Sequence, residues 1–391
     1  RLVSNLIADM SAANPATASA PLLTEGDQSV DRLPENSLFT FFGQFFDHGL
    51  DFINKGGNGT VLVPILPGDP LASHPSFNPA FPFIPVTRAE LAAGTSDGTI
   101  GTGDGINSTA PFVEQSQTYG SAASTTFYLM EYDVNGEPTG GLIHGPDGGM
   151  GTWADVKANA LQWAVAQAIA QGGPIPTEML TDAHVLNVPD VAFWDVATAA
   201  WLPGAETGQA FIADIAHNAN PSGGLAPDAD SIINPHGMNA DGTLAPPPAP
   251  GEYDNELLDA HYVSGDPRVN ENAALTAIHN AFHGEHARIL GQIEDWIQQQ
   301  NEVDPTFAAQ WTGDMKFQAA KIANEMQYQH LVFEEFGRRM SPNIDAFAQY
   351  DININPNITR EFSQAVYRLG HSQLTDGVKV MNASGEMVDL T

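Results

Sequence analysis

The sequence of 391 residues has no cysteine, few basic side chains and no long apolar run. The lack of cysteine excludes disulfides, iron–sulfur clusters, Cys-ligated zinc and thiol catalysis. Only 14 Lys and Arg stand against 47 Asp and Glu, which gives a formal net charge of −33. Because such a surface repels phosphate backbones, we expect no nucleic-acid partner. No apolar run reaches the ~18 residues that a membrane span requires.

What is present is the composition of a globular, mainly helical protein. Hydrophobic residues make up 42% of the chain, which is enough for a large core and excludes wholesale disorder. Helical periodicity is found in five segments: 37–49, 153–171, 270–300, 317–336 and 359–374. Residues 54–111 and 203–251 are rich in Gly, Pro, Asn and Asp, and we interpret them as long loop insertions. We therefore predict a mainly α single domain over residues 1–391, with long loops and little β structure.

The first helical segment carries three polar residues beside a stripe of phenylalanines. Asp47 and His48 stand three and four residues after Gln44, so all three can share one edge of the helix. A neutral imidazole in an apolar wall is a candidate general base. A solvated histidine at a helix end is the alternative.

The third segment and the residues just before it carry a second cluster. Asn270 is the predicted helix N-cap, Glu271 is favourable in the first turn, and Arg268 lies outside the helix. His279 and His283 follow at a spacing of four, which fits two ligands of zinc or iron. A site of that kind needs a third ligand, and buried core histidines are the alternative.

The last segment ends in a Gly–His pair. Gly370 has no side chain, so a flat group can approach the backbone beside His371. This arrangement suits the face of a haem. An unremarkable Gly–His at a fraying helix end is the alternative.

Taken together and in order, these segments resemble the animal-type haem peroxidases. The resemblance rests on residues 42–48, which look like the distal-histidine helix, on 112–121, 265–272 and 317–336, and on 367–371, which look like the proximal-histidine helix. It implies the fold of that family, a helical core around a haem. It also implies a bacterial, secreted protein, one domain of a larger polypeptide, whose C-terminal part is missing after residue 391.

The resemblance implies a role for each matching residue. His371 would ligate the iron of haem b, His48 would move the proton of hydrogen peroxide, and Arg268 would stabilise the charge formed as the O–O bond breaks. Gln44 would line the distal cavity. Asp47 and Glu271 stand where family members form ester bonds to the haem, so covalent attachment is expected here.

Departures from the family pattern affect mainly the calcium site. The backbone carbonyl of Phe112, Glu114 and Ser116 match its loop, but Gly49 stands where the family has an aspartate ligand. Asn272 stands where some members have a methionine bonded to the haem, so we expect no third covalent link.

The implied activity is reduction of hydrogen peroxide coupled to oxidation of a donor. The donor is left open between a halide, manganese(II) and an aromatic compound. The charge of −33 disfavours anions at low salt and favours a cation. Two alternatives are a non-catalytic peroxidase-like module of an extracellular scaffold or adhesion protein, and a zinc enzyme built on His279 and His283.

Overall fold

The computed structural model describes two main parts of the chain and one short piece between them. They are residues 37–176, without 54, 74–76, 90, 100–101, 108 and 122; parts of 194–201; and residues 260–390, without 342, 347, 350, 369, 371–377 and 382–383. The loop predicted over 203–251 lies outside the described residues.

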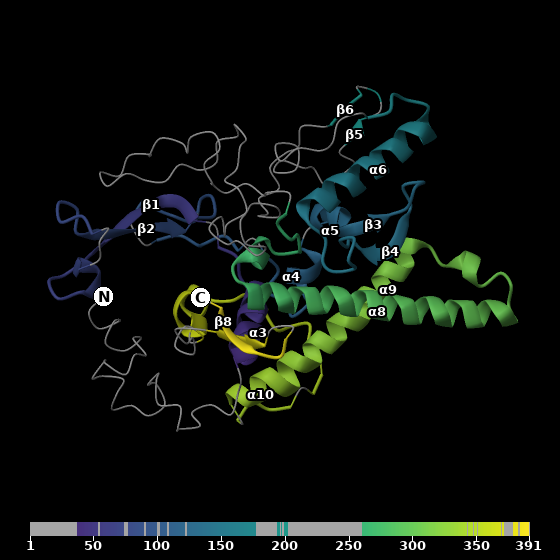
Figure 1. Cartoon of the computed structure of the whole chain (residues 1–391). Helices are drawn as coiled ribbons and strands as arrows, with labels where there is room; N and C mark the ends of the chain where they lie inside the picture. The colour runs from purple at the N-terminus through teal and green to yellow at the C-terminus, as the bar shows by residue number, and fades with distance from the viewer. Residues whose placement is uncertain are drawn as a thin grey trace.

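Two long helices form the frame of the molecule (Figure 1). α8 runs over Ala273–Val303, and α9 over Gly313–His330. A connection of nine residues with one 3-10 turn, η3 (Ala308–Gln310), reverses the chain, so the two helices pack antiparallel. α9 continues into a π-helical turn, η4 (Leu331–Phe336), and then into α10 (Gly337–Met340).

The N-cap predicted for α8 was wrong by two residues. The Asn272 side chain accepts the hydrogen bond from the Leu275 amide, so Asn272 is the cap. Asn270 instead exchanges two hydrogen bonds with the backbone of Tyr262. These two bonds hold the segment before α8 against the backbone of Tyr262.

The predicted first helix is α3 (Ser37–His48), and it packs on the N-terminal half of α8. Its phenylalanines face α8 and α9, where the Phe45 and Phe282 rings stack at 4.8 Å. This core cluster consists of Phe41, Phe45, Leu275, Ile278, Phe282, Tyr328 and Val332. Because α3 is fixed along its length, its last turn is held beside the start of α8.

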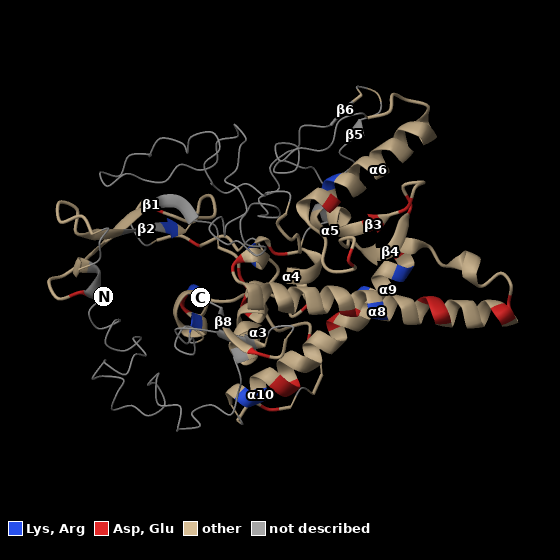
Figure 2. Cartoon of the chain, in the orientation of Figure 1, with Lys and Arg blue, Asp and Glu red and all other residues tan. Residues whose placement is uncertain are grey.

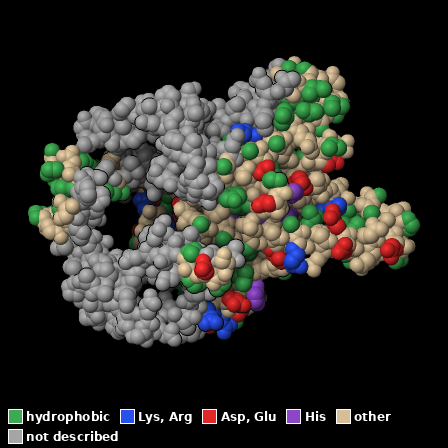
Figure 3. Space-filling view, in the orientation of Figure 1, with side chains coloured by type: hydrophobic (Ala, Val, Ile, Leu, Met, Phe, Trp, Pro, Cys, Tyr) green, Lys and Arg blue, Asp and Glu red, His purple; other side chains and the backbone are tan. Residues whose placement is uncertain are grey.

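A second core lies around α6 (Trp153–Gln171), the helix predicted over the same residues. Thr152 and Asp155 form a capping box at its start, and Gly172 ends it with a positive φ of 67°. The core is completed by α4 (Ser116–Tyr119), α5 (Ala123–Leu129), β3 (Met130–Tyr132) and β4 (Pro138–Leu142). Hydrophobic side chains remain at the surface over the end of α6, where Ile169 and Ile175 are exposed (Figure 3).

The loop predicted over 54–111 was wrong in part, because this segment contains an antiparallel hairpin. β1 (Lys55–Pro64) pairs with β2 (Phe83–Ala89), with Val61 opposite Val86 and Val63 opposite Ile84. A short 3-10 turn, η1 (Pro70–Ser73), lies between the strands. The β-branched runs that form the strands are short and bordered by Gly and Pro, so composition over a wide window hid them.

Within the described residues the fold is mainly α with little β, as predicted. Every strand belongs to a two-stranded antiparallel pair, including β5 (Trp194–Asp195) with β6 (Ala200–Trp201) and β7 (Val378–Met381) with β8 (Met387–Leu390). Two short helical turns complete the elements, η2 (Pro267–Asn270) and η5 (Phe362–Val366). Asp and Glu are spread over the long helices and loops, while Lys and Arg are few (Figure 2). No helix in this part of the chain is long and apolar enough to cross a membrane.

Candidate active site

Three segments that are far apart in the sequence meet at the end of α3. They are the last turn of α3, the turn η2 that precedes α8, and the residues that follow η5. η2 is held in place by backbone hydrogen bonds from Gly265 to Thr118 and from Asp266 to Gln117. A Cβ on Gly265 would lie 2.2 Å from backbone atoms of Ser116 and Gly120, so this close approach requires glycine.

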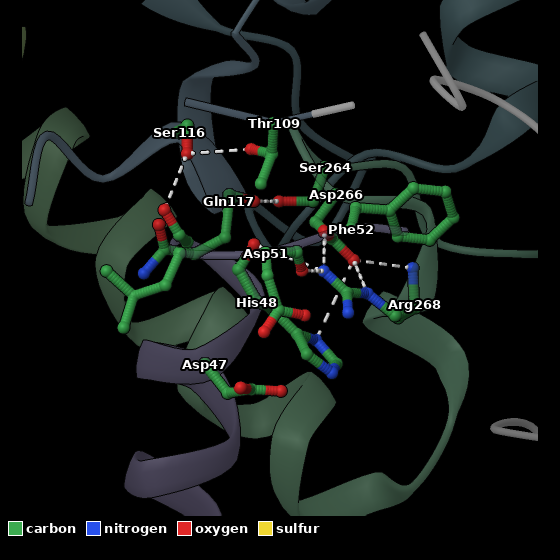
Figure 4. Close-up of polar contacts among 12 residues, drawn as sticks. Asp47, His48, Asp51, Phe52, Thr109, Ser116, Gln117, Ser264, Asp266 and Arg268 are labelled. Atoms are coloured by element: carbon green, nitrogen blue, oxygen red, sulfur yellow. Dashed lines mark hydrogen bonds and ion pairs between the residues drawn. The ribbon is translucent and has the colours of Figure 1, made fainter. Parts of the chain in front are cut away.

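Arg268 is buried and makes hydrogen bonds through two of its three nitrogens (Figure 4). Its Nε donates to Asp266 Oδ1 at 2.8 Å, and NH2 donates to Asp266 Oδ2 at 2.6 Å. NH2 also donates to the backbone carbonyls of Asp51 at 2.8 Å and His48 at 3.2 Å. Burial opposes the charge, but the attraction of Asp266 prevails and raises the pKa of Arg268. The guanidinium is therefore a fixed positive charge.

His48 lies below Arg268 and is only 3% exposed. Its Nδ1 is 3.7 Å from Asp266 Oδ1, and its Nε2 is 3.6 Å from Glu271 Oε2. Burial, followed by repulsion from Arg268 and Arg368, lowers the pKa of His48 well below its usual value. The imidazole is therefore neutral and able to accept a proton.

Gln44 is oriented by the residues at the start of α8. Because the Asn272 Oδ1 caps the helix, its Nδ2 faces Gln44 and donates to Oε1 at 2.9 Å. Gln44 Nε2 then donates to Glu271 Oε2 at 2.7 Å. The Glu271 side chain therefore belongs to the site, between Gln44 and His48, and the residue precedes the first turn of α8.

Asp47 is bound on one side by Arg368, whose NH1 donates to Oδ2 at 2.6 Å. Its Oδ1 is buried, and no described residue gives it a hydrogen bond. Burial and then the nearby Asp51 carboxylate raise the pKa of Asp47 to about 6, against the opposing pull of Arg368. Tyr367 reaches the same helix and donates to the Gly43 carbonyl at 3.0 Å. His371 lies outside the described residues, so its role stays a prediction.

The three residues predicted to bind calcium have different neighbours in the structure. Ser116 Oγ donates to the Gly49 carbonyl at 3.4 Å and lies 3.2 Å from Thr109 Oγ1. Glu114 faces another way: its charge interacts with Lys321 and Glu325 on α9, and burial raises its pKa. The Phe112 side chain is exposed. No group of three or more His, Asp or Glu suited to a metal occurs among the described residues.

His279 and His283 lie in a buried polar network. Ser264 Oγ donates to the Gln117 carbonyl at 2.7 Å and lies 3.0 Å from His279 Nδ1 and 3.2 Å from His283 Nε2. Burial lowers the pKa of both imidazoles. The part of the chain described here supplies no third ligand for a zinc ion, which favours the core-histidine alternative.

Sequence reasoning missed two residues that organise the site, Asp266 and Ser264. Asp266 stands next to Pro267, and its side chain caps η2 by accepting from the Arg268 amide. An Asp–Pro pair at the start of a turn is a usable local signal. Ser264 offers no such signal, because its partners are 15 to 147 residues away.

One family model matches part of this chain. Residues 236–390 match the family model described as animal haem peroxidase. This match includes Arg268, Glu271 and His371 but not α3. The residues that α3 contributes to the site therefore lie outside the matched region.

Relatives with curated names are similar over shorter segments. The chain is 29% identical over 134 residues to peroxidase mlt-7 of Caenorhabditis elegans, covering 33% of this chain and 17% of that protein. It is 30% identical over 116 residues to peroxidasin of Drosophila melanogaster, covering 28% and 7%. Each match thus spans less than a fifth of the relative's length. Peroxidase A from Dictyostelium discoideum aligns with a TM-score of 0.49 at 15% identity, over 90% of this chain and 49% of that one.

Proposed function

Because residues 236–390 belong to the animal haem peroxidase family, we propose that this chain is a haem peroxidase that reduces hydrogen peroxide and oxidises a small donor. The observation that carries the proposal is the meeting of His48 with Arg268. These residues are 220 positions apart, and the Arg268 NH2 is 3.2 Å from the His48 carbonyl. Arg268 lies within the family match, and the fold brings His48, which lies outside that match, next to it.

The described residues fit one face of a haem. A neutral, buried imidazole stands beside a fixed guanidinium, and Asp47 Oδ1 is a buried acceptor without a hydrogen bond from the described chain. Glu271 is partly exposed next to both, with 32% of its side chain accessible. We assign haem b to this face: His371 would ligate its iron, and Asp47 and Glu271 would be the residues that bond to it covalently. When bound, haem supplies the redox chemistry that protein side chains lack.

His48 and Arg268 have different roles in the proposed reaction. His48 takes a proton from one oxygen of hydrogen peroxide and returns it to the departing oxygen. Arg268 stabilises the negative charge that develops as the O–O bond breaks, and it stays charged throughout. Its NH1 makes no hydrogen bond with the described residues and is the donor available for this step. Gln44 lines the same cavity, with an amide orientation set by Asn272.

The donor is a halide, manganese(II) or an aromatic compound. The net charge of −33 favours the cation, because it raises the local concentration of positive ions. Phe112, Glu114 and Ser116 would be the residues that hold a calcium ion, and the Glu114 charge also interacts with Lys321. The acidic composition, with few Lys and Arg, supports an extracellular location.

A second candidate is a peroxidase-like module without catalysis. The contacts of Tyr367 and Arg368 with α3 favour it, because they join the residues just before His371 directly to the helix that carries His48. In such a module these contacts would hold the two segments together without a cofactor. The two candidates differ in whether the protein takes up haem and reacts with peroxide.

The test is an absorption spectrum of protein made in haem-supplemented cells, followed by addition of hydrogen peroxide. We expect a Soret band that shifts on addition, and its loss in His371→Ala. His48→Ala should keep the band and slow the reaction with peroxide about a hundredfold or more. His144→Ala, on an exposed histidine, is the matched control and should change neither. Haem-free protein, or a His48→Ala variant of full activity, would favour the module without catalysis.

A further inference from the structure

The carboxylate of Asp266 lies close to both residues assigned to peroxide chemistry. It binds the Arg268 guanidinium through both oxygens, at 2.8 and 2.6 Å, and its Oδ1 is 3.7 Å from His48 Nδ1. Asp266 is 3% exposed. Figure 4 shows these three side chains facing one another, with Asp266 on the side of Arg268 away from the body of α3.

The same carboxylate fixes the backbone that carries Arg268. Asp266 Oδ1 accepts from the Arg268 amide at 2.9 Å and so closes the turn η2. The Phe52 ring lies 4.7 Å from the guanidinium carbon and holds its plane from another side. Nε and NH2 of Arg268 are thereby occupied by hydrogen bonds within the protein. NH1 is the guanidinium nitrogen that remains available to bind a substrate.

Asp266 is also one of the charged groups that surround His48. Arg268 and Arg368 disfavour a proton on His48, while Asp266 and Glu271 lie within 4 Å of its two nitrogens. His279 also interacts electrostatically with His48. If the Asp266 charge were removed, the buried Arg268 would lose its counterion and would repel a proton on His48 more strongly.

We propose that Asp266 is the positioning residue of this site: it sets the direction of the Arg268 guanidinium and balances its charge beside His48. The kinetic consequence of this inference rests on the proposed function. Its geometric part, a carboxylate that holds a guanidinium next to His48, stands independently of haem.

Chemical rescue tests both parts. In Arg268→Ala, free guanidinium ion can occupy the space that the side chain leaves, provided that Asp266 is there to bind it. We expect guanidinium at millimolar concentration to restore the rate of the peroxide reaction at least tenfold in Arg268→Ala and to leave Arg268→Ala/Asp266→Asn unchanged. Asp266→Asn alone should lower this rate about ten- to a hundredfold, with the KM for the donor unchanged. Asp266→Glu should recover part of the loss.

Arg288→Ala is the matched control. Arg288 makes the same two-pronged pair with Glu285, at 2.7 and 2.6 Å, but on the exposed surface of α8. Its removal and the addition of guanidinium should leave the peroxide rate unchanged. Equal rescue in the single and double variants, or a wild-type rate in Asp266→Asn, would overturn the proposal.

A measurement without haem separates this inference from the proposed function. At the same millimolar concentrations, guanidinium should raise the melting temperature of Arg268→Ala but not of Arg268→Ala/Asp266→Asn. This difference in a protein without peroxidase activity would contradict the proposed function while supporting the geometric role of Asp266. No difference would contradict the geometric role itself, whatever the activity of the wild type.

Discussion

Arg368 NH1 donates to Asp47 Oδ2 at 2.6 Å, although the two residues are 321 positions apart. The pair joins the last turn of α3 to the residues that follow η5. Arg368 also reaches Asp51 Oδ1 at 3.4 Å, so one cation serves two buried carboxylates. Burial, and then repulsion from the Asp51 carboxylate, raise the pKa of Asp47 to about 6 despite the ion pair with Arg368.

The first prediction concerns the pH dependence of stability due to Asp47. Its pKa is higher in the folded chain, about 6, than its ordinary value of 3.8. The folded state therefore binds the proton more tightly, and this contribution to stability is full below pH 3.8 and lost as the pH rises through about 6. The loss amounts to about 3 kcal/mol.

Denaturant unfolding of the haem-free chain between pH 4 and 7 measures this effect. Asp47→Asn should remove most of the decrease in the free energy of unfolding over this range. Asp351→Asn, at an exposed aspartate whose pKa is lowered by hydrogen bonds to Asn353, is the control and should leave the decrease in place. An unchanged slope in Asp47→Asn would show that other groups cause the pH dependence.

The second prediction concerns Ser264, which binds His279 and His283 in the core. Ser264→Ala removes the hydroxyl that contacts both imidazoles and leaves buried nitrogens without this partner. We expect a loss of about 2–3 kcal/mol in the free energy of unfolding. Ser341→Ala, in a surface turn where the hydroxyl accepts one backbone amide at 3.3 Å, should lose less than about 1 kcal/mol. Equal losses in the two variants would argue against the buried network.

The third prediction concerns two glycines with opposite surroundings. Gly265→Ala places a Cβ 2.2 Å from backbone atoms, so we expect η2 to shift and the protein to lose about 3 kcal/mol or more. Gly291 lies on the exposed side of α8 with nothing within 4 Å, and Gly291→Ala should stabilise by about 0.5–1 kcal/mol. Thermal unfolding of both variants measures the difference in sign. Two changes of the same sign would contradict the packing of η2 against α4.

The fourth prediction separates the proposed donors by salt. If a halide is oxidised, added inert salt should raise turnover at low halide, because it screens the repulsion by the acidic surface. If manganese(II) is oxidised, the same salt should lower turnover. Steady-state rates at ionic strengths from about 0.01 to 0.15 M cover a change in screening length from about 30 to 8 Å. A neutral aromatic donor serves as the control and should show little change.

Much of the helical frame could be predicted from local pattern alone. The phenylalanine stripe of α3, the alanine-rich α6 and the apolar face of α8 each repeat at the helical period, and each helix is found within a few residues of its predicted bounds. The hairpin β1–β2 and the cap Asn272 were mispredicted. A hairpin depends on pairing across 18 intervening residues, and a cap depends on which of several polar residues turns towards the helix.

For the candidate site, the sequence identified the residues that we expect to carry the chemistry, and the tertiary structure decided how they are paired. Gln44, His48, Arg268 and Glu271 were identified from their types, their spacing and a family resemblance, and the charge of −33 follows from composition. That Arg268 binds Asp266 and not Asp51's side chain, that Arg368 binds Asp47, and that Ser264 joins two histidines became visible only in the fold. Local pattern reflects interactions within one helical turn, whereas these pairs form between buried groups whose distance is set by the packing of α3 on α8. Burial then removes water as a competing partner, so the geometry of the core decides which polar groups meet.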